Sequence, residues 1–272
     1  MTCVRQAWLV LGSATVQLED LAAGYVCQNL DLGWPDIREV KNGRPDRDGL
    51  DDRTQLFGGR PVTAQITALT GAGATIDAVA ASFAPFMVPS ARPVLHYVLD
   101  RSGAAERTVT LRSAGYAWQV AGPYQRDIHL AWIAADPYVY DPAVQTASTT
   151  PAGAGADISA AGDTGVWPRL QITGPVTGAD LTFTPSLPPV WHLAFLSSFT
   201  VAAGHYIDID TGARTVYLDG DPAKPRLSSL DWTRSTWQWV PPAPNTTTMT
   251  LSGTATTGAT NVTATWQDAY LT

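Results

Sequence analysis

The sequence predicts a mainly β protein with two domains, residues 1–145 as a β-domain with one helix and a long β-hairpin, and residues 146–272 as a β-sandwich or jelly roll. The length of 272 residues exceeds the size of about 100–200 residues that is usual for one domain. Charged residues make up only 15% of the chain, below the roughly 25% typical of globular proteins. This composition, together with turn signals at short intervals, favours strands over long solvated helices.

Runs of apolar and β-branched residues, some of them alternating with polar ones, predict the strands of the first domain. We expect strands at residues 4–17, 25–30, 94–99, 107–113, 117–120 and 126–133. The apolar stretch at residues 7–16 also resembles the core of a signal peptide, but acidic residues follow it instead of a small-residue cleavage site. We therefore interpret this stretch as a first strand.

Residues 36–70 are predicted to form a long β-hairpin with arms at 36–40 and 53–69, because a run rich in Gly, Pro and charged residues at 41–52 marks a solvated tip. Residues 75–86 are the one good helix candidate, since apolar residues recur there at helical spacing. Thr75 is the expected cap of this helix, and Pro85 its expected end.

The second half of the chain is predicted to contain no helix. Residues 141–165 hold no aromatic residue and consist largely of Ala, Gly, Thr, Ser and Pro, so we expect a linker or an exposed loop there. Beyond it, short strands alternate with turn dipeptides, which indicates a β-sandwich or jelly roll. The turns are expected at Gly174-Pro175, Thr177-Gly178, Pro188-Pro189, Ala203-Gly204, Thr211-Gly212, Asp219-Gly220 and Pro241-Pro242.

Charge and hydropathy exclude several classes of partner. The formal net charge is −7, and the five basic residues beyond position 146 are not clustered. Binding to nucleic acid or to an anionic membrane needs clustered Lys and Arg, so neither is expected as a partner. No other stretch is long enough to span a bilayer. Cys3 and Cys27 lack the spacing of a metal or disulfide framework and are expected to be buried free thiols.

No sequence motif indicates an enzyme, a cofactor site or a metal site. The GxSxG elbow, the GxxxxGK[ST] phosphate loop and HExxH are all absent, and the four histidines are far apart. Residues 46–57 faintly resemble a calcium loop, but Leu50 and Phe57 stand where its fifth and twelfth ligands belong. We therefore expect no catalytic residue, no cofactor and no metal ligand.

Two features of the second half leave alternatives open. Asp208 and Asp210 alternate on one strand and permit a glycosidase-like pair, although the Thr-Gly turn that follows favours a role in that turn. Three of the ten tryptophans, Trp232, Trp237 and Trp239, lie close together in the sequence. They are candidate glycan contacts, with burial in the core as the alternative.

Several segments, in consistent order, resemble the distal tail or minor tail proteins of actinobacteriophages, a family of siphophage tail-tip proteins. In the first half they are LDLGWPDIR at 30–38 and DGLDDRTQLFGGRPV at 48–62. In the second half they are WPRLQITGP at 167–175, GHYIDIDT at 204–211, WQWV at 237–240 followed by Pro242 and Asn245, and ATWQDAY at 264–270. These are turn and strand signatures, so the resemblance depends on their succession over nearly the whole chain.

The resemblance implies a structural role without turnover. Members of this family form a ring, commonly of six copies, that joins the tail tube to the host-attachment apparatus. The implied first domain is tail-tube-like and forms the ring, and the implied second domain is a galectin-like β-sandwich. The implied partners are the tail tube protein, the tape measure protein and tail-tip or receptor-binding proteins, in a virion made in the host cytoplasm. Residues 241–245 depart from the shorter turn of related proteins.

A ring requires subunit contacts, and the predicted hairpin is the expected source of them. Its arms carry more apolar surface than an isolated two-stranded ribbon can hide, so a neighbouring subunit is the simplest cover. Leu56, Phe57 and Arg60 are the candidate interface residues. The alternative is a carbohydrate-binding module that contacts the host cell envelope. However, galectin sugar sites use Glu among their ligands, and residues 146–272 contain none.

Overall fold

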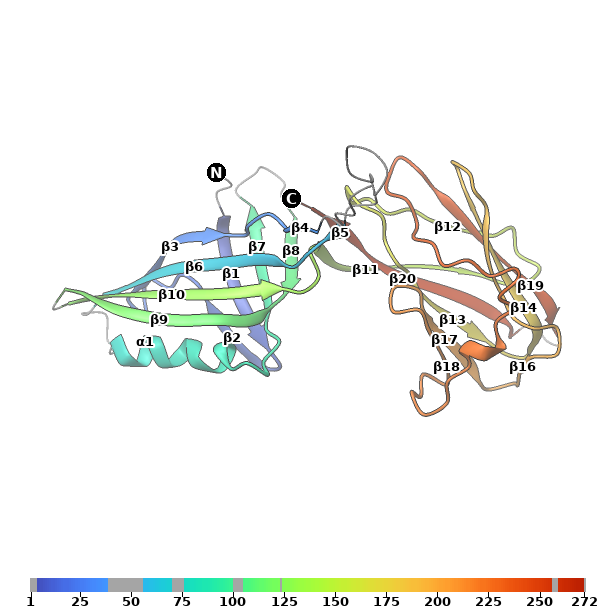
Figure 1. The fold of residues 1–272 in the computed structure, drawn as a ribbon, viewed down its shortest axis with the longest axis horizontal. Coiled ribbons are helices and arrows are strands. Elements are labelled where there is room, and N and C mark those ends of the chain that lie inside the picture. The colour runs from blue at the N-terminus through green and yellow to red at the C-terminus, as the bar shows by residue number, and fades with distance from the viewer. Residues whose placement is uncertain are drawn as a thin grey trace, which may run out of the picture. The chain divides into compact units, whose positions relative to one another are not determined.

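The computed structural model describes residues 4–38, 56–69, 76–99, 105–122, 124–255 and 259–271. The chain separates into two compact units, Met1–Val139 and Tyr140–Thr272 (Figure 1). Both units are built mainly from antiparallel strands, and α1 (Ile76–Phe83) is the one α-helix among the described residues. The predicted mainly β fold is confirmed. The domain division expected between residues 145 and 146 stays a prediction, and that position lies within β11 (Val139–Thr149).

The first unit contains two sheets, each of which buries one face. One sheet has the order β8-β7-β1-β2 and is formed by β1 (Val4–Leu11), β2 (Ala14–Gln17), β7 (Val94–Leu99) and β8 (Glu106–Thr110). The other has the order β3-β6-β10-β9 and is formed by β3 (Tyr25–Asp31), β6 (Arg60–Leu69), β9 (Arg112–Gly122) and β10 (Gln125–Ala134). The alternation that predicts these strands places Ile128, Leu130 and Trp132 in the core.

The segment predicted as a single strand at residues 4–17 is a hairpin of two strands. β1 and β2 pair with Leu11 opposite Ala14, so Gly12 and Ser13 form the loop between them. Gly12 has a φ of 59°, in the left-handed region that glycine adopts at the least cost. The prediction missed this turn because the apolar run continues on both sides of it.

The predicted helix is confirmed. Val79 and Phe83 of α1 are buried, and the Phe83 ring packs edge-on against Tyr25 of β3 with a centroid distance of 5.8 Å. Pro85 does not end the helical segment, because η1 (Ala84–Met87) continues it as a 3-10 turn with Pro85 near its start. The expected cap, Thr75, lies outside the described residues.

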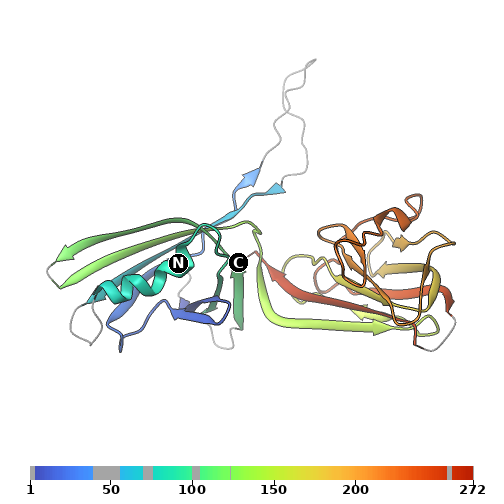
Figure 2. The ribbon, with the colours of Figure 1, turned by 90° about the horizontal axis from the view of Figure 1, so that it is seen from below.

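The base of the predicted hairpin is present. β4 (Ile37–Arg38) pairs with β5 (Leu56–Phe57), and the Gly58 amide donates to the Asp36 carbonyl at 2.5 Å (Figure 2). The predicted tip at 41–52 lies outside the described residues.

The second arm is not the free ribbon that the sequence predicts. After Gly59 it becomes β6, which pairs with β3 on one side and β10 on the other. Val62, Ala64, Ile66 and Ala68 are therefore buried inside the first unit. A neighbouring subunit is not needed to cover them, so that part of the reasoning for a hairpin interface is wrong.

The second unit also contains two sheets that each bury one face. One has the order β18-β17-β13-β20-β11 and consists of β11, β13 (Arg169–Thr173), β17 (Tyr206–Asp210), β18 (Thr215–Leu218) and β20 (Asn261–Tyr270). The other has the order β12-β19-β14-β15, with β16 also paired to β14, and consists of β12 (Ala156–Ile158), β14 (Val176–Pro185), β15 (Trp191–Ala194), β16 (Thr200–Val201) and β19 (Thr247–Ala255). The only helical segment among the described residues of this unit is the 3-10 turn η2 (Leu227–Ser229).

The predicted linker at 141–165 is wrong. Its first part belongs to β11, which lies beside β20 in the sheet, and its later part contains β12 and the fully buried Ile158. The small residues serve close packing, because a Cβ at Gly162 would lie 2.0 Å from the Ala269 carbonyl oxygen. Composition alone does not distinguish glycine that permits a close approach from glycine in a flexible linker.

Limited proteolysis is accordingly expected to spare residues 141–165. Cleavage requires local opening of the chain, and backbone that is paired in a sheet or packed in the core resists it. The measurement is mass spectrometry of the earliest fragments produced by a protease of broad specificity at a low ratio of enzyme to protein. An early cut between residues 141 and 165 that left two stable fragments would show that this segment is a linker after all.

Candidate functional site

Strand β9, at the edge of the β3-β6-β10-β9 sheet, carries several exposed apolar side chains. Trp118 lies opposite Ile128, and Tyr116 lies opposite Leu130, so both face the same side as two buried residues of β10. Trp118 is nevertheless 49% exposed, and Val120, on the same side, is 63% exposed. The apolar side of the sheet, which is buried at β10, is therefore partly exposed to solvent at β9.

Contacts with α1 and β10 hold the aromatic residues of β9 in place. The Tyr116 hydroxyl donates to the Ala80 carbonyl at 3.2 Å, and burial raises the pKa of this phenol. The Arg126 guanidinium lies 4.5 Å from the centre of the Trp118 ring and pairs with Asp77 at 2.8 Å. Figure 2 shows α1 along one face of the β9 and β10 strands. These rings are presented to solvent in a defined orientation.

Strand β9 also lacks the features that protect the sheet edges of monomeric proteins. Its sequence, RSAGYAWQVAG, contains a single charged residue, Arg112, and no proline. Isolated edge strands are normally short, charged or interrupted, because their free N–H and C=O groups otherwise pair with another chain. The sequence predicted a strand at 117–120, but alternation alone does not show that this strand is an edge.

The candidate interface residues lie at the hairpin base and at the start of β6. Leu56 and Phe57 form β5, and Phe57 is partly exposed. Arg60 is only 2% exposed, and its Nε donates to the Pro137 carbonyl at 2.9 Å. The interface role of the three residues stays a prediction, and this burial argues against direct contact between the Arg60 guanidinium and a neighbouring chain.

The candidate glycan contacts Trp232, Trp237 and Trp239 occupy different settings. Trp232 is exposed beside a turn in which the Asp231 carboxylate accepts hydrogen bonds from the backbone N–H and hydroxyl of Thr233, which lowers the Asp231 pKa. Trp237 is half-buried. Trp239 is exposed, and its ring lies over Gly165, where a Cβ would be 2.5 Å from Cε3. Their role as glycan contacts stays a prediction.

A further tryptophan, which the sequence did not single out, lies near Trp239. Val166 and Val240 form an antiparallel bridge. The exposed Trp167 follows Val166, and the exposed Trp239 precedes Val240, so the bridge brings the two tryptophan positions opposite each other. The pairing of segments so far apart in the chain is not visible in the sequence.

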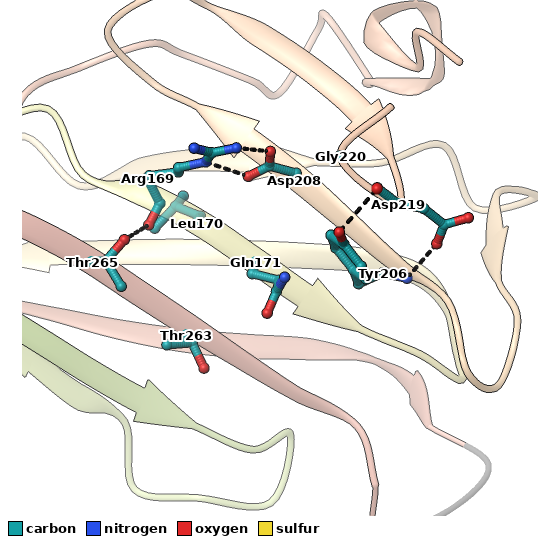
Figure 3. Close-up of a pocket in the computed structure, with 9 residues that line it drawn as sticks. All are labelled: Arg169, Leu170, Gln171, Tyr206, Asp208, Asp219, Gly220, Thr263 and Thr265. Carbon is teal, nitrogen blue, oxygen red and sulfur yellow. Dashed lines mark hydrogen bonds and ion pairs between the residues drawn. The ribbon is translucent and has the colours of Figure 1, made fainter. Parts of the chain in front are cut away.

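A pocket of about 330 Å³ lies on the polar face of the β18-β17-β13-β20-β11 sheet (Figure 3). Strand alternation brings Arg169 and Gln171 from β13, Tyr206 and Asp208 from β17, and Thr263 and Thr265 from β20 to this face. Arg169 forms a bidentate pair with Asp208, in which Nε donates to Oδ1 at 2.7 Å and Nη2 donates to Oδ2. These hydrogen bonds are the main cause of the raised pKa of Arg169.

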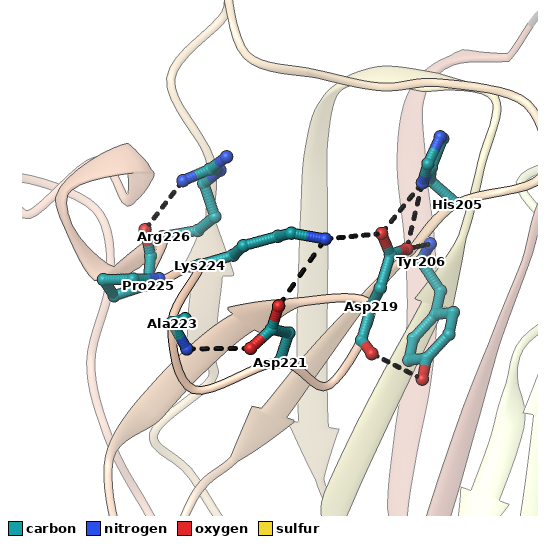
Figure 4. Close-up of polar contacts among 8 residues, drawn as sticks. All are labelled: His205, Tyr206, Asp219, Asp221, Ala223, Lys224, Pro225 and Arg226. Carbon is teal, nitrogen blue, oxygen red and sulfur yellow. Dashed lines mark hydrogen bonds and ion pairs between the residues drawn. The ribbon is translucent and has the colours of Figure 1, made fainter.

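One wall of the pocket is fixed by Asp219 (Figure 4). Its carboxylate is 2.9 Å from His205 Nδ1 and accepts the Tyr206 backbone N–H at 3.2 Å. The hydrogen bond to His205 is the main reason that the pKa of Asp219 is lowered. The Tyr206 hydroxyl donates to the Asp219 backbone carbonyl at 2.9 Å, which holds the phenol ring against the turn.

The two carboxylates of the glycosidase-like pair are both engaged in other contacts. Asp208 is buried and bound to Arg169, whereas Asp210 accepts the Ala213 backbone N–H at 2.7 Å and so stabilises the turn. The turn role predicted from the sequence therefore holds for Asp210 and is wrong for Asp208. Within the described ranges no group of three or more His, Cys, Asp or Glu residues is placed to hold a metal ion.

The remaining candidate groups belong to strands and turns. A strand position is expected for each of the four histidines, and His96, His129 and His192 do lie in β7, β10 and β15. The expectation is wrong for His205, which lies in the turn just before β17. Cys27, in β3, is a free thiol whose pKa is raised to about 11, mainly by burial; Cys3 lies outside the described residues. No helix in the described part of the chain is long and apolar enough to cross a membrane.

The described residues form two units of antiparallel sheets, and the first unit has an exposed apolar edge strand, β9. No family model and no curated protein sequence matches the chain. The solved structure of the Dit protein of phage SPP1 is similar over 97% of this chain and 99% of that chain, with a TM-score of 0.66 and 14% identity. That protein is described as a paradigm of the hub adsorption apparatus in phages that infect Gram-positive bacteria.

Two structures of the phage P2 baseplate in its activated conformation, with Ca and with Sr, contain chains that also match. Each match covers 97% of this chain and 98% of the other, with 10% and 12% identity and a TM-score of 0.49. The fold of this chain is that of the SPP1 Dit protein, so the resemblance to distal tail proteins seen in the sequence is confirmed at the level of the fold.

Proposed function

We propose that this chain is a non-enzymatic structural component of a bacteriophage tail tip, a distal tail protein whose ring connects the tail tube to the host-attachment apparatus. The fold shared with the SPP1 Dit protein over nearly the full length of both chains supports this role. The proposed partners are other copies of the chain, which form a ring of six, together with the tail tube protein, the tape measure protein and tail-tip or receptor-binding proteins.

The observation that carries the proposal is the edge of β9, which carries exposed aromatic residues and a single charged residue. A ring requires each subunit to offer two different surfaces that close on each other by rotation. The β3-β6-β10-β9 sheet has two different edges, β9 and β3. Pairing of β9 with β3 of the next copy would satisfy the free backbone groups of both strands and would cover Trp118 and Val120.

The test of the ring is the mass and shape of the purified chain in solution. We expect light scattering to give a mass several times the 28.9 kDa of the monomer, and negative-stain images to show closed rings of one symmetry. A chain that stays monomeric at high concentration would contradict the proposed function. The same images count the copies directly.

The hairpin base is a second proposed contact, and it predicts a separate effect. Replacing Leu56 and Phe57 with Asp is expected to weaken the ring by roughly tenfold or more, because two charged groups would enter an apolar contact. Light scattering over a dilution series measures the change, while circular dichroism checks that the fold is intact. An unaffected ring in the double variant would remove this hairpin from the interface.

The comparisons do not favour the carbohydrate-binding module as the main role, because the similar structures are hub and baseplate proteins. A hydrolase is not supported either, since Asp208 is bound by Arg169 and Asp210 by a backbone N–H.

A further inference from the structure

The pocket on the second unit offers hydrogen-bonding groups in ordered rows. Gln171 pairs in register with Thr263 of β20 on one side and with Asp208 of β17 on the other. Adjacent strands in a sheet are roughly 4.8 Å apart, so these three side chains form a row of polar groups at that spacing. Arg169 and Thr265 form the start of a second row. Figure 3 shows Thr263, Gln171 and Asp208 on three neighbouring strands.

Several of these groups retain free hydrogen-bonding capacity. No described residue forms a hydrogen bond with the side-chain amide of Gln171, which lies between Thr263 and Tyr206 in Figure 3. The Arg169 side chain is 64% exposed, and Asp208 engages only its Nε and Nη2 atoms, so Nη1 is left to donate. The Thr263 hydroxyl, 3.0 Å from that of Ser148, can still exchange bonds with a ligand. Donors and acceptors are thus both present.

The charges of the pocket disfavour ionic ligands. Asp208 neutralises the one lining cation, Arg169, and the second lining carboxylate, Asp219, lies 2.9 Å from His205 and 4.0 Å from the Lys224 ammonium. The charged groups of the lining are therefore already partnered, so an ionic ligand would lose hydration on entering without gaining an unpaired counter-charge. Apolar ligands are disfavoured too, because the Leu170 side chain is fully buried, which leaves the Tyr206 ring as the main apolar group available to a ligand.

We propose that this pocket binds a neutral saccharide. A sugar matches its mixture of donors and acceptors, its lack of net positive charge and the fixed Tyr206 ring, against which an apolar face of a pyranose can pack. The volume of about 330 Å³ suits a ligand of one or two sugar units. This site is distinct from Trp232, Trp237 and Trp239, none of which lines it.

The test uses the full chain and saturation-transfer NMR, in which a ligand receives magnetisation only while bound. The probes are the methyl glycosides of glucose, galactose, mannose, rhamnose and N-acetylglucosamine, each at millimolar concentration, with sodium phosphate and sodium acetate as competitors. At least one glycoside is expected to give a signal that the two anions do not reduce. The double variant Gln171→Ala/Thr263→Val is expected to weaken binding roughly tenfold or more, because two hydrogen bonds are lost.

The matched control is Thr184→Val, which changes an exposed threonine of β14 on the other sheet and should leave the signal unchanged. The proposal is overturned if no glycoside gives a signal, if phosphate or acetate competes, or if the Gln171→Ala/Thr263→Val variant binds as the wild type does. Loss of signal only in a Trp232→Ala/Trp239→Ala variant would overturn it as well, by moving the sugar to the tryptophans. None of these results depends on whether the chain forms a ring.

Discussion

Replacing Trp118 and Val120 with Asp is expected to convert the ring into monomers. Both side chains lie on the exposed apolar side of β9, at 49% and 63% exposure. Covering the exposed part of each in a subunit contact would stabilise the ring by roughly 1 kcal/mol or more. Burying a carboxylate in the same place would cost several kcal/mol of desolvation. Together these changes should weaken each contact by more than roughly a thousandfold, which light scattering would register as a loss of the ring mass.

The control for this experiment is the variant Ala117→Asp/Gln119→Asp. It places the same two charges on the same strand, at positions that alternate with Trp118 and Val120 and whose side chains lie on the other face of the sheet. Circular dichroism should show that both variants keep their β structure. If the Trp118→Asp/Val120→Asp chain still formed rings, or if the control lost them to the same extent, β9 would not be the ring-closing edge.

Replacing Gly162 with Ala is expected to lower the melting temperature of the second unit by roughly 10 °C or more. A Cβ at this position would lie 2.0 Å from the Ala269 carbonyl oxygen and 2.9 Å from the Ala269 backbone nitrogen. These are backbone atoms at the end of β20, so the strand would have to move. Overpacking of this severity costs more than about 3 kcal/mol. Scanning calorimetry measures the shift.

Substitutions at two other glycines serve as controls for that shift in melting temperature. A Cβ at Gly122 would meet no atom within 4 Å, so Gly122→Ala should leave the melting temperature nearly unchanged. Gly204 also has free space but a φ of +79°, so Gly204→Ala should cost only about 1 kcal/mol of backbone strain. If Gly162→Ala were as stable as Gly122→Ala, residues 159–165 would not be packed against β20, and the linker interpretation would regain its support.

Local patterns in the sequence were sufficient to determine many of the elements. The alternation of Ile128, Leu130 and Trp132 predicts β10 and its buried face, and helical spacing with Val79 and Phe83 predicts α1. Side-chain periodicity reports the local backbone geometry directly, because it is 3.6 in a helix and 2.0 in a strand. The succession of turn motifs also predicts the fold shared with the SPP1 Dit protein.

Pairing between distant segments was decided only by the tertiary structure. Periodicity predicts that a strand exists, but its neighbours depend on contacts between residues that are far apart in the chain. Strand order makes β6 a central strand and β9 an exposed edge, although both alternate in the same way.

The same physical reason applies to the candidate sites and to the predicted linker. The ion pair of Arg169 with Asp208 and the proximity of Trp167 to Trp239 both join segments that no local pattern connects. For residues 141–165, composition alone predicted a linker, whereas pairing with β20 and a close approach at Gly162 make the segment part of a packed sheet. The sequence alone thus determined many of the strands, and the tertiary structure determined which strand edges and polar faces remain free to bind.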